Sequence, residues 1–346
     1  MSGGIKLKAL VKTAKGVGNV EIKNIPEPVP GSGQVKILVK AAGICGTDLH
    51  IYNDEYPSIP PVVLGHEIAG EIVECGKGVC ACEVGKRVTT RTFMITCGRC
   101  QYCNTGKDNL CPERLSIGSG VNGGFARYVI VPEKNIFYLP QNISYAAGAL
   151  TEPLACCVHA VLEVAHVSVG ERVLIIGPGP IGILCSQLVK ASGGYVVVIG
   201  TASDKQRLQL AKDLGADEVI ITSQVNSLTE REKNLAFDVV FECSGTEEGV
   251  NIGLKLLRKG GRYTQIGLSG KLIKFPIDQA VYKEVKFFGS FSHTWSAWDA
   301  AIRLLSRGLV QTEPLVTHKL PLSCWKEAFK MFEEKKCIKI ILIPDD

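Results

Sequence analysis

Cys45 and His66 are the first two side chains in this sequence whose types could do chemistry together. A cysteine thiolate and an imidazole are ligands that a catalytic zinc ion favours, with a third protein ligand and one position open for water or substrate. Taken singly, each residue is better explained as a buried structural cysteine or a hydrogen-bonded core histidine. Gly43, Gly46 and Gly65 indicate a tightly constrained backbone at both residues, which favours a metal site.

Two carboxylates are candidates for the rest of this site. Glu67 follows His66 directly, and Glu152 lies far downstream in the segment Leu150–Leu154. Carboxylate oxygens also bind zinc, so either residue could complete the ligand set. The residue types alone leave the choice between them open.

A second metal-binding pattern lies in a loop that is rich in turn-forming residues. Cys97, Cys100, Cys103 and Cys111 have the spacing C-x2-C-x2-C-x7-C. Four thiolates in one short loop can close a tetrahedron around zinc. An iron–sulfur cluster also uses four cysteines, but no nearby feature indicates electron transfer, and a reducing compartment disfavours two disulfides. We therefore expect a closed structural zinc site, and two zinc ions per chain in all.

A glycine motif lies between an expected strand and an expected helix. Residues 172–176 are typical of a buried strand, residues 183–191 of a helix, and Gly177-Pro178-Gly179-Pro180-Ile181-Gly182 joins them. This context is the one that a dinucleotide-binding fingerprint requires. The first glycine would permit the turn, the second would let the backbone approach the pyrophosphate, and the third would let helix pack on strand. The helix N-terminus, with Pro180 and Ile181, would face the phosphates.

Composition and charge exclude several classes of protein. The chain has 346 residues, 46% hydrophobic and 21% charged, which indicates an ordinary globular protein with two domains. A net charge of +5 without basic blocks does not favour nucleic acid. No apolar run approaches the roughly 18 residues of a membrane span. Fourteen cysteines without a signal peptide favour a reducing, cytoplasmic location.

The order of elements predicts an α/β fold with two domains. Short β-rich segments occupy the N-terminal part, among them residues 35–42, 68–74, 87–90 and 125–131. From residue 171 strands and helices alternate, which is typical of a parallel doubly wound sheet. Two helices, at residues 297–306 and 323–334, and a final β-run at residues 337–343 then return to the first domain. We place the domains at residues 1–155 with 292–346, and at 156–291.

With these motifs in place, the chain resembles the zinc-dependent medium-chain dehydrogenase/reductase family over essentially its whole length. The resemblance is carried by CGTDLH at residues 45–50, GHE at 65–67, the four-cysteine loop, EPL at 152–154 and GPGPIG at 177–182. It is closest to the polyol (sorbitol-like) and threonine dehydrogenase branches. It implies a GroES-like β domain interrupted by a Rossmann domain, in a homodimer or homotetramer.

The resemblance also implies roles at the catalytic zinc. Cys45 and His66 match zinc ligands, and Glu152 matches the ligand of the sorbitol-like branch, with Cys156 and Cys157 as its local rivals. Glu67 matches a carboxylate that either touches zinc or holds its water. Asp48 matches the carboxylate that orients His66. Thr47 and His50 match a hydroxyl and imidazole relay for the alcohol proton, although His50 could also be a simple surface histidine.

The implied reaction is hydride transfer between a secondary alcohol and a nicotinamide coenzyme, with zinc acting as Lewis acid on the substrate oxygen. We expect a polyol or polyol phosphate as substrate, with a threonine or 2,3-butanediol-type alcohol as the alternative. Threonine-specific relatives carry a histidine near the position of Met94. Sorbitol enzymes carry an Arg-Tyr pair where this chain has residues 291–295, and His293 could enter the pocket or pack beside Trp295.

The coenzyme preference follows from the end of the second strand of the Rossmann domain. NAD-specific domains place an acidic residue there, whereas this chain has Gly200, Thr201 and Ser203 before Asp204. We expect NADP, or use of both coenzymes, with the hydroxyls and Arg207 on the 2′-phosphate. Asp204 as a helix cap and Arg207 as an exposed helix residue are the alternative. The resemblance also assigns coenzyme contacts to Ser244, Gly245, Ile266, Gly267 and Phe291.

Two other functions are compatible with such a fold. A zinc-free reductase of the quinone-reductase type would not need the zinc ligands, which are all present here. A non-enzymatic nucleotide-sensing or structural protein would not need an intact proton relay beside them. Both alternatives are therefore less favoured than a zinc enzyme.

Overall fold

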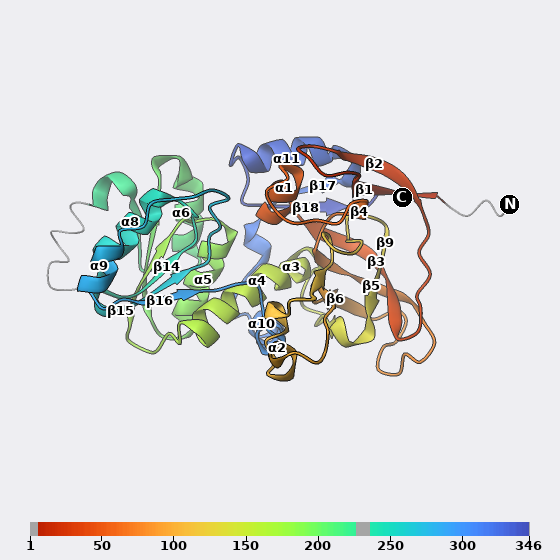
Figure 1. The fold of residues 1–346 in the computed structure, drawn as a ribbon, viewed down its shortest axis with the longest axis horizontal. Helices are drawn as coiled ribbons and strands as arrows, with labels where there is room; N and C mark the ends of the chain where they lie inside the picture. The colour runs from red at the N-terminus through yellow and green to blue at the C-terminus, as the bar shows by residue number, and fades with distance from the viewer. Residues whose placement is uncertain (1–5, 226–235, 346) are drawn as a thin grey trace. The chain divides into compact units, whose positions relative to one another are not determined.

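The computed structural model describes residues 6–225 and 236–345, and it has the expected α/β fold (Figure 1). The chain divides into two compact units, one formed by Met1–Glu152 with Thr312–Asp346 and the other by Pro153–Gln311. Within the described ranges, no helix is long and apolar enough to cross a membrane.

The first unit is built from two principal sheets in its described part. One has three strands in the order β2-β1-β4, and the other has seven, in the order β10-β6-β5-β3-β18-β17 with β9 also paired to β3. A short pair, β7-β8, adjoins the cysteine loop. The strands are β1 Lys6–Lys12, β2 Val20–Pro26, β3 Gln34–Gly43, β4 Val62–Val63, β5 Glu67–Cys75, β6 Arg87–Thr90, β7 Phe93–Ile95, β8 Leu115–Ser116, β9 Tyr128–Pro132, β10 Ile136–Tyr138, β17 Val316–Pro321 and β18 Lys339–Ile343.

Two strands of this unit determine where the site residues lie. β3 is almost wholly buried, pairs antiparallel with β5, and ends at Gly43 opposite Glu67. β18, from the C-terminal segment, pairs with β3 at Gly43 through Ile341. Residues far apart in the sequence are therefore brought together at the end of β3. The helices of this unit are α1 Gly46–Tyr52, α2 Gln101–Asn104, α3 Tyr145–Ala149 and α11 Trp325–Glu333.

The second unit is a parallel sheet with its strands in the order β13-β12-β11-β14-β15-β16 among the described residues. This order reverses between β11 and β14, as in a doubly wound dinucleotide-binding fold. The strands are β11 Arg172–Ile176, β12 Tyr195–Gly200, β13 Glu218–Ile221, β14 Phe237–Glu242, β15 Leu257–Gln265 and β16 Lys286–Gly289. Helices α5 Pro180–Ala191 and α6 Lys205–Asp213 pack on β11–β13, and α8 Glu247–Leu256 packs on β14 and β15.

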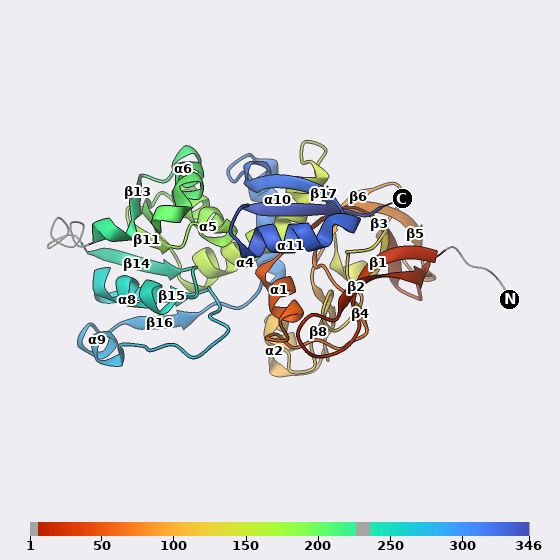
Figure 2. The same cartoon turned by 90° about the horizontal axis from the view of Figure 1, so that it is seen from above.

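Several boundaries in this unit differ from those that we expected. The helix that begins with α4 Thr151–Val158 continues as a π-helix, His159–Val164. Helix α10, Trp295–Ser306, lies in the second unit, whereas we had assigned residues 292–311 to the first domain. Glu163 of the π-helix explains this placement, because it accepts hydrogen bonds from Thr294 (2.7 Å) and Ser296 (2.6 Å) at the start of α10. Helix α9, Ile277–Tyr282, which we did not predict, lies beside β16 (Figure 2).

Candidate active site and coenzyme site

The first metal-binding group lies where β3, α1 and β5 meet. Ligand atoms of Cys45, His66 and Glu67 all lie within 4.8 Å of one another. Cys45 is the N-cap of α1, and Glu67 begins β5. Two glycines make this approach possible: a Cβ on Gly43 would lie 2.0 Å from Glu67 Oε2, and Gly65 has a φ of +89°. Gly46 is different, since a Cβ there would have no neighbour within 4 Å, so our expectation of a crowded backbone at that residue was wrong.

Asp48 links the two ligand-bearing segments. Its Oδ2 accepts a hydrogen bond from the Cys45 N–H (2.9 Å), and its Oδ1 lies 3.7 Å from His66 Nδ1. Nδ1 of the ring therefore faces a carboxylate, which leaves Nε2 for a metal. Burial alone would lower the pKa of His66, but the charges of Asp48 and Cys45 outweigh it and raise the pKa well above its usual value. The group thus has the electrostatics of a cation site.

Lys339 is a component of this site that the sequence did not indicate. It is fully buried on β18, and its Nζ donates hydrogen bonds to Glu67 Oε1 and to the carbonyl of Ile44 (2.8 Å). Burial acts to lower the pKa of Lys339, but Glu67 and Cys45 raise it, so the ammonium is charged. The second oxygen of Glu67, Oε2, accepts no hydrogen bond within the described part of the chain. Glu67 therefore has one oxygen neutralised by Lys339 and one still available.

Glu152 is nearby but outside the tightest group. It is buried at the start of α4, and its charge contributes to raising the pKa of both His66 and Lys339. Of its two rivals, Cys157 donates its thiol to the carbonyl of Ile181 (3.5 Å), which directs that sulfur to the glycine motif. Glu152 and Cys156 both remain candidates for an additional ligand.

The expected proton relay lies on α1 next to Cys45. The Cys45 thiol donates to Thr47 Oγ1 at 3.7 Å. His50, half-buried one turn further on, has its Nδ1 2.7 Å from Glu55 Oε2. This contact identifies Glu55 as a residue that sequence reasoning missed. Because Glu55 occupies Nδ1, only Nε2 of His50 remains to exchange a proton.

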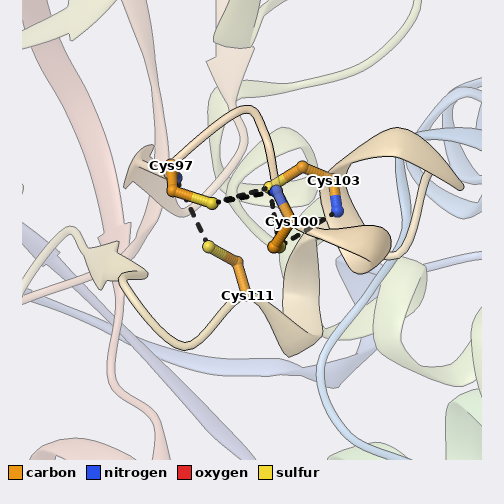
Figure 3. Close-up of side chains that lie close together, drawn as sticks. All are labelled: Cys97, Cys100, Cys103 and Cys111. Atoms are coloured by element: carbon orange, nitrogen blue, oxygen red, sulfur yellow. Dashed lines mark hydrogen bonds between the residues drawn. The ribbon is translucent and has the colours of Figure 1, made fainter.

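The four cysteines of the second pattern converge, with their sulfur atoms turned toward a common centre (Figure 3). The Cys97–Cys103 and Cys100–Cys103 sulfur atoms are 3.9 and 3.6 Å apart. Sulfur atoms bound tetrahedrally to zinc at about 2.3 Å lie about 3.8 Å apart, so the arrangement fits the ion. Backbone N–H groups of Cys97, Cys100 and Cys103 point at sulfur atoms of the cluster, which stabilises thiolates.

The pKa values within this cluster diverge. Hydrogen bonds from the backbone N–H groups of Arg99 and Cys100 lower the pKa of Cys97 to about 7. Burial and the neighbouring thiols raise the pKa of Cys103 to about 12. Without a metal ion, Cys97 therefore loses its proton more easily than Cys103. Binding of zinc requires that all four cysteines lose their protons.

The glycine motif has the geometry that a dinucleotide fingerprint needs. Gly177 has a φ of +94°, and a Cβ on it would lie 2.9 Å from the Ser244 nitrogen. A Cβ on Gly182 would lie 2.0 Å from the Gly177 carbonyl oxygen, whereas one on Gly179 would meet nothing within 4 Å. The first and third glycines are therefore required by the fold, and the second leaves open space for a ligand. Helix α5 begins at Pro180 rather than at Ile183 as expected, because proline is favoured in a first turn.

At the end of β12, the polar groups that follow Gly200 contact one another. The hydroxyls of Thr201 and Ser203 are 2.7 Å apart. Asp204 is buried, and its Oδ2 accepts hydrogen bonds from Thr201 N (2.9 Å) and Thr201 Oγ1 (2.5 Å). Arg207 Nη1 lies 3.5 Å from Asp204 Oδ1. Asp204 thus serves as a cap, as our alternative interpretation held, and Arg207 is tethered to it rather than fully exposed.

The remaining predicted coenzyme residues lie in loops that follow β14 and β15. Ser244 and Gly245 follow β14, and Ile266 and Gly267 follow β15 and donate their backbone N–H groups to the Glu242 carbonyl oxygen. Phe291 lies beyond β16 and is partly exposed.

His293 and Met94, the two positions considered for substrate selection, are both buried. His293 packs edge-on against Trp298, with ring centroids 4.7 Å apart, while Trp295 is exposed. Met94 lies in β7. Neither residue lies in the group formed by Cys45, His66 and Glu67.

Comparison with known proteins agrees with this geometry. Residues 31–141 match the model of the alcohol dehydrogenase GroES-like domain, and residues 180–307 match that of zinc-binding dehydrogenases. A sorbitol dehydrogenase of Halalkalibacterium halodurans is 41% identical over 98% of this chain and 100% of its own. The chain belongs to the zinc-dependent medium-chain dehydrogenase/reductase family. It is an alcohol-type dehydrogenase that uses zinc and a nicotinamide coenzyme, which confirms the resemblance.

Other relatives of this dehydrogenase carry different names. A D-arabitol-phosphate dehydrogenase of Enterococcus avium is 39% identical over 96% of this chain and 97% of its own. An L-threonine 3-dehydrogenase of Pyrococcus horikoshii is 36% identical over 98% and 99%. Among solved structures, a zinc-binding dehydrogenase of Sinorhizobium meliloti bound to NADP has a TM-score of 0.89 at 31% identity, covering 98% of this chain and 100% of that one. A 2R,3R-butanediol dehydrogenase of Bacillus subtilis has a TM-score of 0.87 at 30% identity, covering 98% and 100%.

Proposed function

We propose that this dehydrogenase oxidises a secondary hydroxyl of a polyol or polyol phosphate to a ketone, with transfer of the hydride to the nicotinamide coenzyme. The observation that carries this proposal is the group of Cys45, His66 and Glu67, with Glu152 beside it, in a chain that also has the glycine motif. The 41% and 39% identical relatives named for sorbitol and D-arabitol phosphate support the substrate class.

Cys45, His66 and Glu152 are the residues that we propose as holders of the catalytic zinc, with Glu67 either touching the ion or holding its water. When bound there, zinc supplies Lewis acidity at the substrate oxygen. Asp48 lies against Nδ1 of the His66 ring, and Lys339 neutralises one oxygen of Glu67 and leaves the other available. The cysteine loop holds a second, structural zinc ion.

The alcohol proton leaves through Thr47 and His50. Thr47 Oγ1 lies beside the Cys45 sulfur, where it can accept the proton of a substrate hydroxyl and pass its own onward. His50 takes up that proton at Nε2, because Glu55 occupies Nδ1 and stabilises the resulting imidazolium.

Glu152→Ala tests the proposed ligand set. We expect loss of one zinc ion or of turnover, with binding of the coenzyme retained because the glycine motif lies in the other unit. Cys156→Ser is the matched control and should change neither zinc content nor turnover. Equal activity and zinc content in Glu152→Ala would assign the ligand to Glu67 or Cys156 instead.

The substrate class is tested by comparing kcat/KM for polyols, polyol phosphates, L-threonine and 2,3-butanediol with both coenzymes. We expect the highest value for a polyol or its phosphate. Relatives named L-threonine 3-dehydrogenase and 2R,3R-butanediol dehydrogenase make those two alcohols the alternative. A highest value for either of them would refute the polyol assignment.

We further propose that NADP is accepted at least as well as NAD. No carboxylate other than the capping Asp204 follows β12 directly, so the hydroxyls of Thr201 and Ser203 and the Arg207 guanidinium are the groups that would bind a 2′-phosphate, with Arg207 exchanging its contact with Asp204 for the phosphate. A charge-assisted hydrogen bond is worth about 1.5–3 kcal/mol, or roughly tenfold to a hundredfold in affinity. Arg207→Ala should lower kcat/KM for NADP by about that factor and spare NAD.

Lys205→Ala is the control for this test, because Lys205 is exposed on the same helix. An acidic substitution at Gly200 is a poorer test, since a Cβ there would lie 2.8 Å from the Pro178 ring and disturb the glycine motif. A strong natural preference for NAD, together with an unchanged Arg207→Ala variant, would show that Arg207 only tethers Asp204.

The second unit also offers a surface for assembly into a homodimer, or into a homotetramer of such pairs. β16 is the terminal strand of its sheet in the described part of the chain, and it has β15 as its one neighbour. Phe287 of β16 and Ile277 and Val281 of the adjacent α9, all substantially exposed, line an apolar hollow of about 530 Å³. A twofold axis at this edge would pair β16 with its own copy and cover these side chains.

Sedimentation equilibrium tests the proposed assembly. The natural protein should be dimeric or tetrameric at micromolar concentration, and Val281→Glu should shift it toward the monomer. Val84→Glu, in an exposed loop of the other unit, is the control. A monomeric natural protein would refute the proposal.

A further inference from the structure

Glu242 is a buried carboxylate that neither the metal sites nor the glycine motif uses. It is the last residue of β14 and has no exposed surface. Its Oε1 accepts hydrogen bonds from Ser244 N (2.8 Å) and Ser244 Oγ, and its Oε2 from Gly245 N (2.9 Å) and Gln265 Nε2 (2.6 Å). All four of these donors belong to the loop after β14 or to the end of β15. An ionised carboxylate only accepts hydrogen bonds, so it suits such a set of donors.

The two loops held by Glu242 also touch each other. The backbone oxygen of Glu242 accepts hydrogen bonds from Ile266 and Gly267, each at 2.9 Å. A Cβ on Gly267 would lie 2.4 Å from Gly245 N, and one on Gly245 would lie 2.3 Å from the Leu268 carbonyl oxygen. The loops after β14 and β15 therefore pack backbone against backbone, and Glu242 is hydrogen-bonded to both segments.

The position of these loops in the sheet indicates what they serve. A doubly wound sheet of this order binds a dinucleotide across the reversal between β11 and β14, with one mononucleotide at each half. The glycine motif and the 2′-site at the end of β12 belong to the first half, which holds the adenosine side. The loops after β14 and β15 belong to the second half, which faces the nicotinamide side.

We propose that Glu242 is a positioning residue for the nicotinamide half of the coenzyme. The N–H groups of Ser244 and Gly245 point inward because they donate to the two oxygens of Glu242. The loop after β14 therefore faces the coenzyme with its remaining groups. The proposal rests on the proposed function, because it requires that a nicotinamide dinucleotide binds here. A glutamine at this position would set an amide NH2 against N–H donors and release one side of the pair of loops.

The test compares binding of the whole coenzyme with binding of its adenosine fragment. Dissociation constants of NADPH, NADH, 2′,5′-ADP and ADP are measured by calorimetry for the natural zinc-loaded enzyme and for Glu242→Gln. We expect the variant to bind both whole coenzymes about tenfold or more weakly, and both fragments within about twofold of the natural enzyme. Glu248→Gln, on the exposed face of α8, should bind all four as the natural enzyme does.

A double substitution distinguishes two roles of Glu242: positioning the loop after β14, and only stabilising the fold through its hydrogen bond to Gln265. Glu242→Gln with Gln265→Glu keeps one carboxylate and one amide in contact between the strands. If Glu242 positions the loop, this swap raises the melting temperature above that of Glu242→Gln but leaves whole-coenzyme binding weak. Recovery of whole-coenzyme binding in the swap would overturn the proposal.

Two further outcomes would also overturn it. One is unchanged whole-coenzyme binding in Glu242→Gln, and the other is an equal loss for coenzyme and fragment. If Glu242→Gln does not fold, Gln265→Met removes one donor to the same carboxylate and should show the same selective loss to a smaller degree. A natural enzyme that binds none of the four ligands would refute the proposed function itself.

Discussion

Replacing Lys339 by methionine tests the buried charge pair beneath the catalytic group. Methionine keeps most of the length of lysine but removes the ammonium that bonds to Glu67 and to the Ile44 carbonyl. Both charged groups are fully buried, so Glu67 would be left as an unpaired carboxylate. Removing one partner of such a pair costs about 3–5 kcal/mol. At roughly 2–4 °C per kcal/mol for a unit of this size, the melting temperature should fall by about 6–20 °C.

The assay is scanning calorimetry of the zinc-loaded enzyme, with Lys336→Met as a control because that lysine is exposed. Glu67→Gln added to Lys339→Met removes the stranded charge and should recover most of the lost stability. A melting temperature for Lys339→Met within about 2 °C of the natural enzyme would refute the reasoning. A double variant that is less stable than Lys339→Met would also refute it, because the unpaired Glu67 carboxylate would then not be the cause of the lost stability.

Two more predictions concern metal and pH. Cys100→Ser should reduce the zinc content from two ions to one and make the loop sensitive to protease, since metal binding folds such loops; one zinc in the natural protein would contradict this. Burial acts to raise the pKa of Glu163, but His159, Ser296 and Thr294 outweigh it and depress the pKa to about 2. Glu163 therefore stabilises the folded protein above the unfolded pKa of 4.5, and this stabilisation is lost as pH falls toward 2. For this half-exposed group the contribution is roughly 1–2 kcal/mol after solvent screening. Glu163→Gln should lose it near pH 7, and a deficit that stays constant down to pH 3 in denaturation experiments would contradict the assignment.

The sequence predicted those features that local pattern determines. The strand, glycine motif and helix at residues 172–191 were found where expected, because buried strands and tight glycine turns have local signatures. The convergence of Cys97, Cys100, Cys103 and Cys111 was likewise predictable from spacing. Start and end residues were less accurate, as in α5, where the first turn begins at a proline.

Long-range pairings could not be predicted in this way. Lys339 lies in a β-run that has no special feature by itself, and it joins Glu67 only because β18 pairs with β3. Helix α1 was not predicted either, since it begins with glycine and depends on the cap formed by Cys45 and Asp48. Glu242 resembled any residue at the end of a strand, because its donors come from the turn after β14 and from the end of β15, and neither contact has a local sequence signature.

The pairing of β18 with β3 has a consequence for biosynthesis. Glu67 is made early, but its partner Lys339 emerges only after the whole of Pro153–Gln311 has been translated. At about 5–20 residues per second, the interval between Glu152 and Lys339 is roughly 10–40 s. During that time the nucleotide-binding unit can fold first, while the sheet that carries Glu67 still lacks strand β18. Strand β18, which is translated after the nucleotide-binding unit, thus completes the sheet beside the catalytic group.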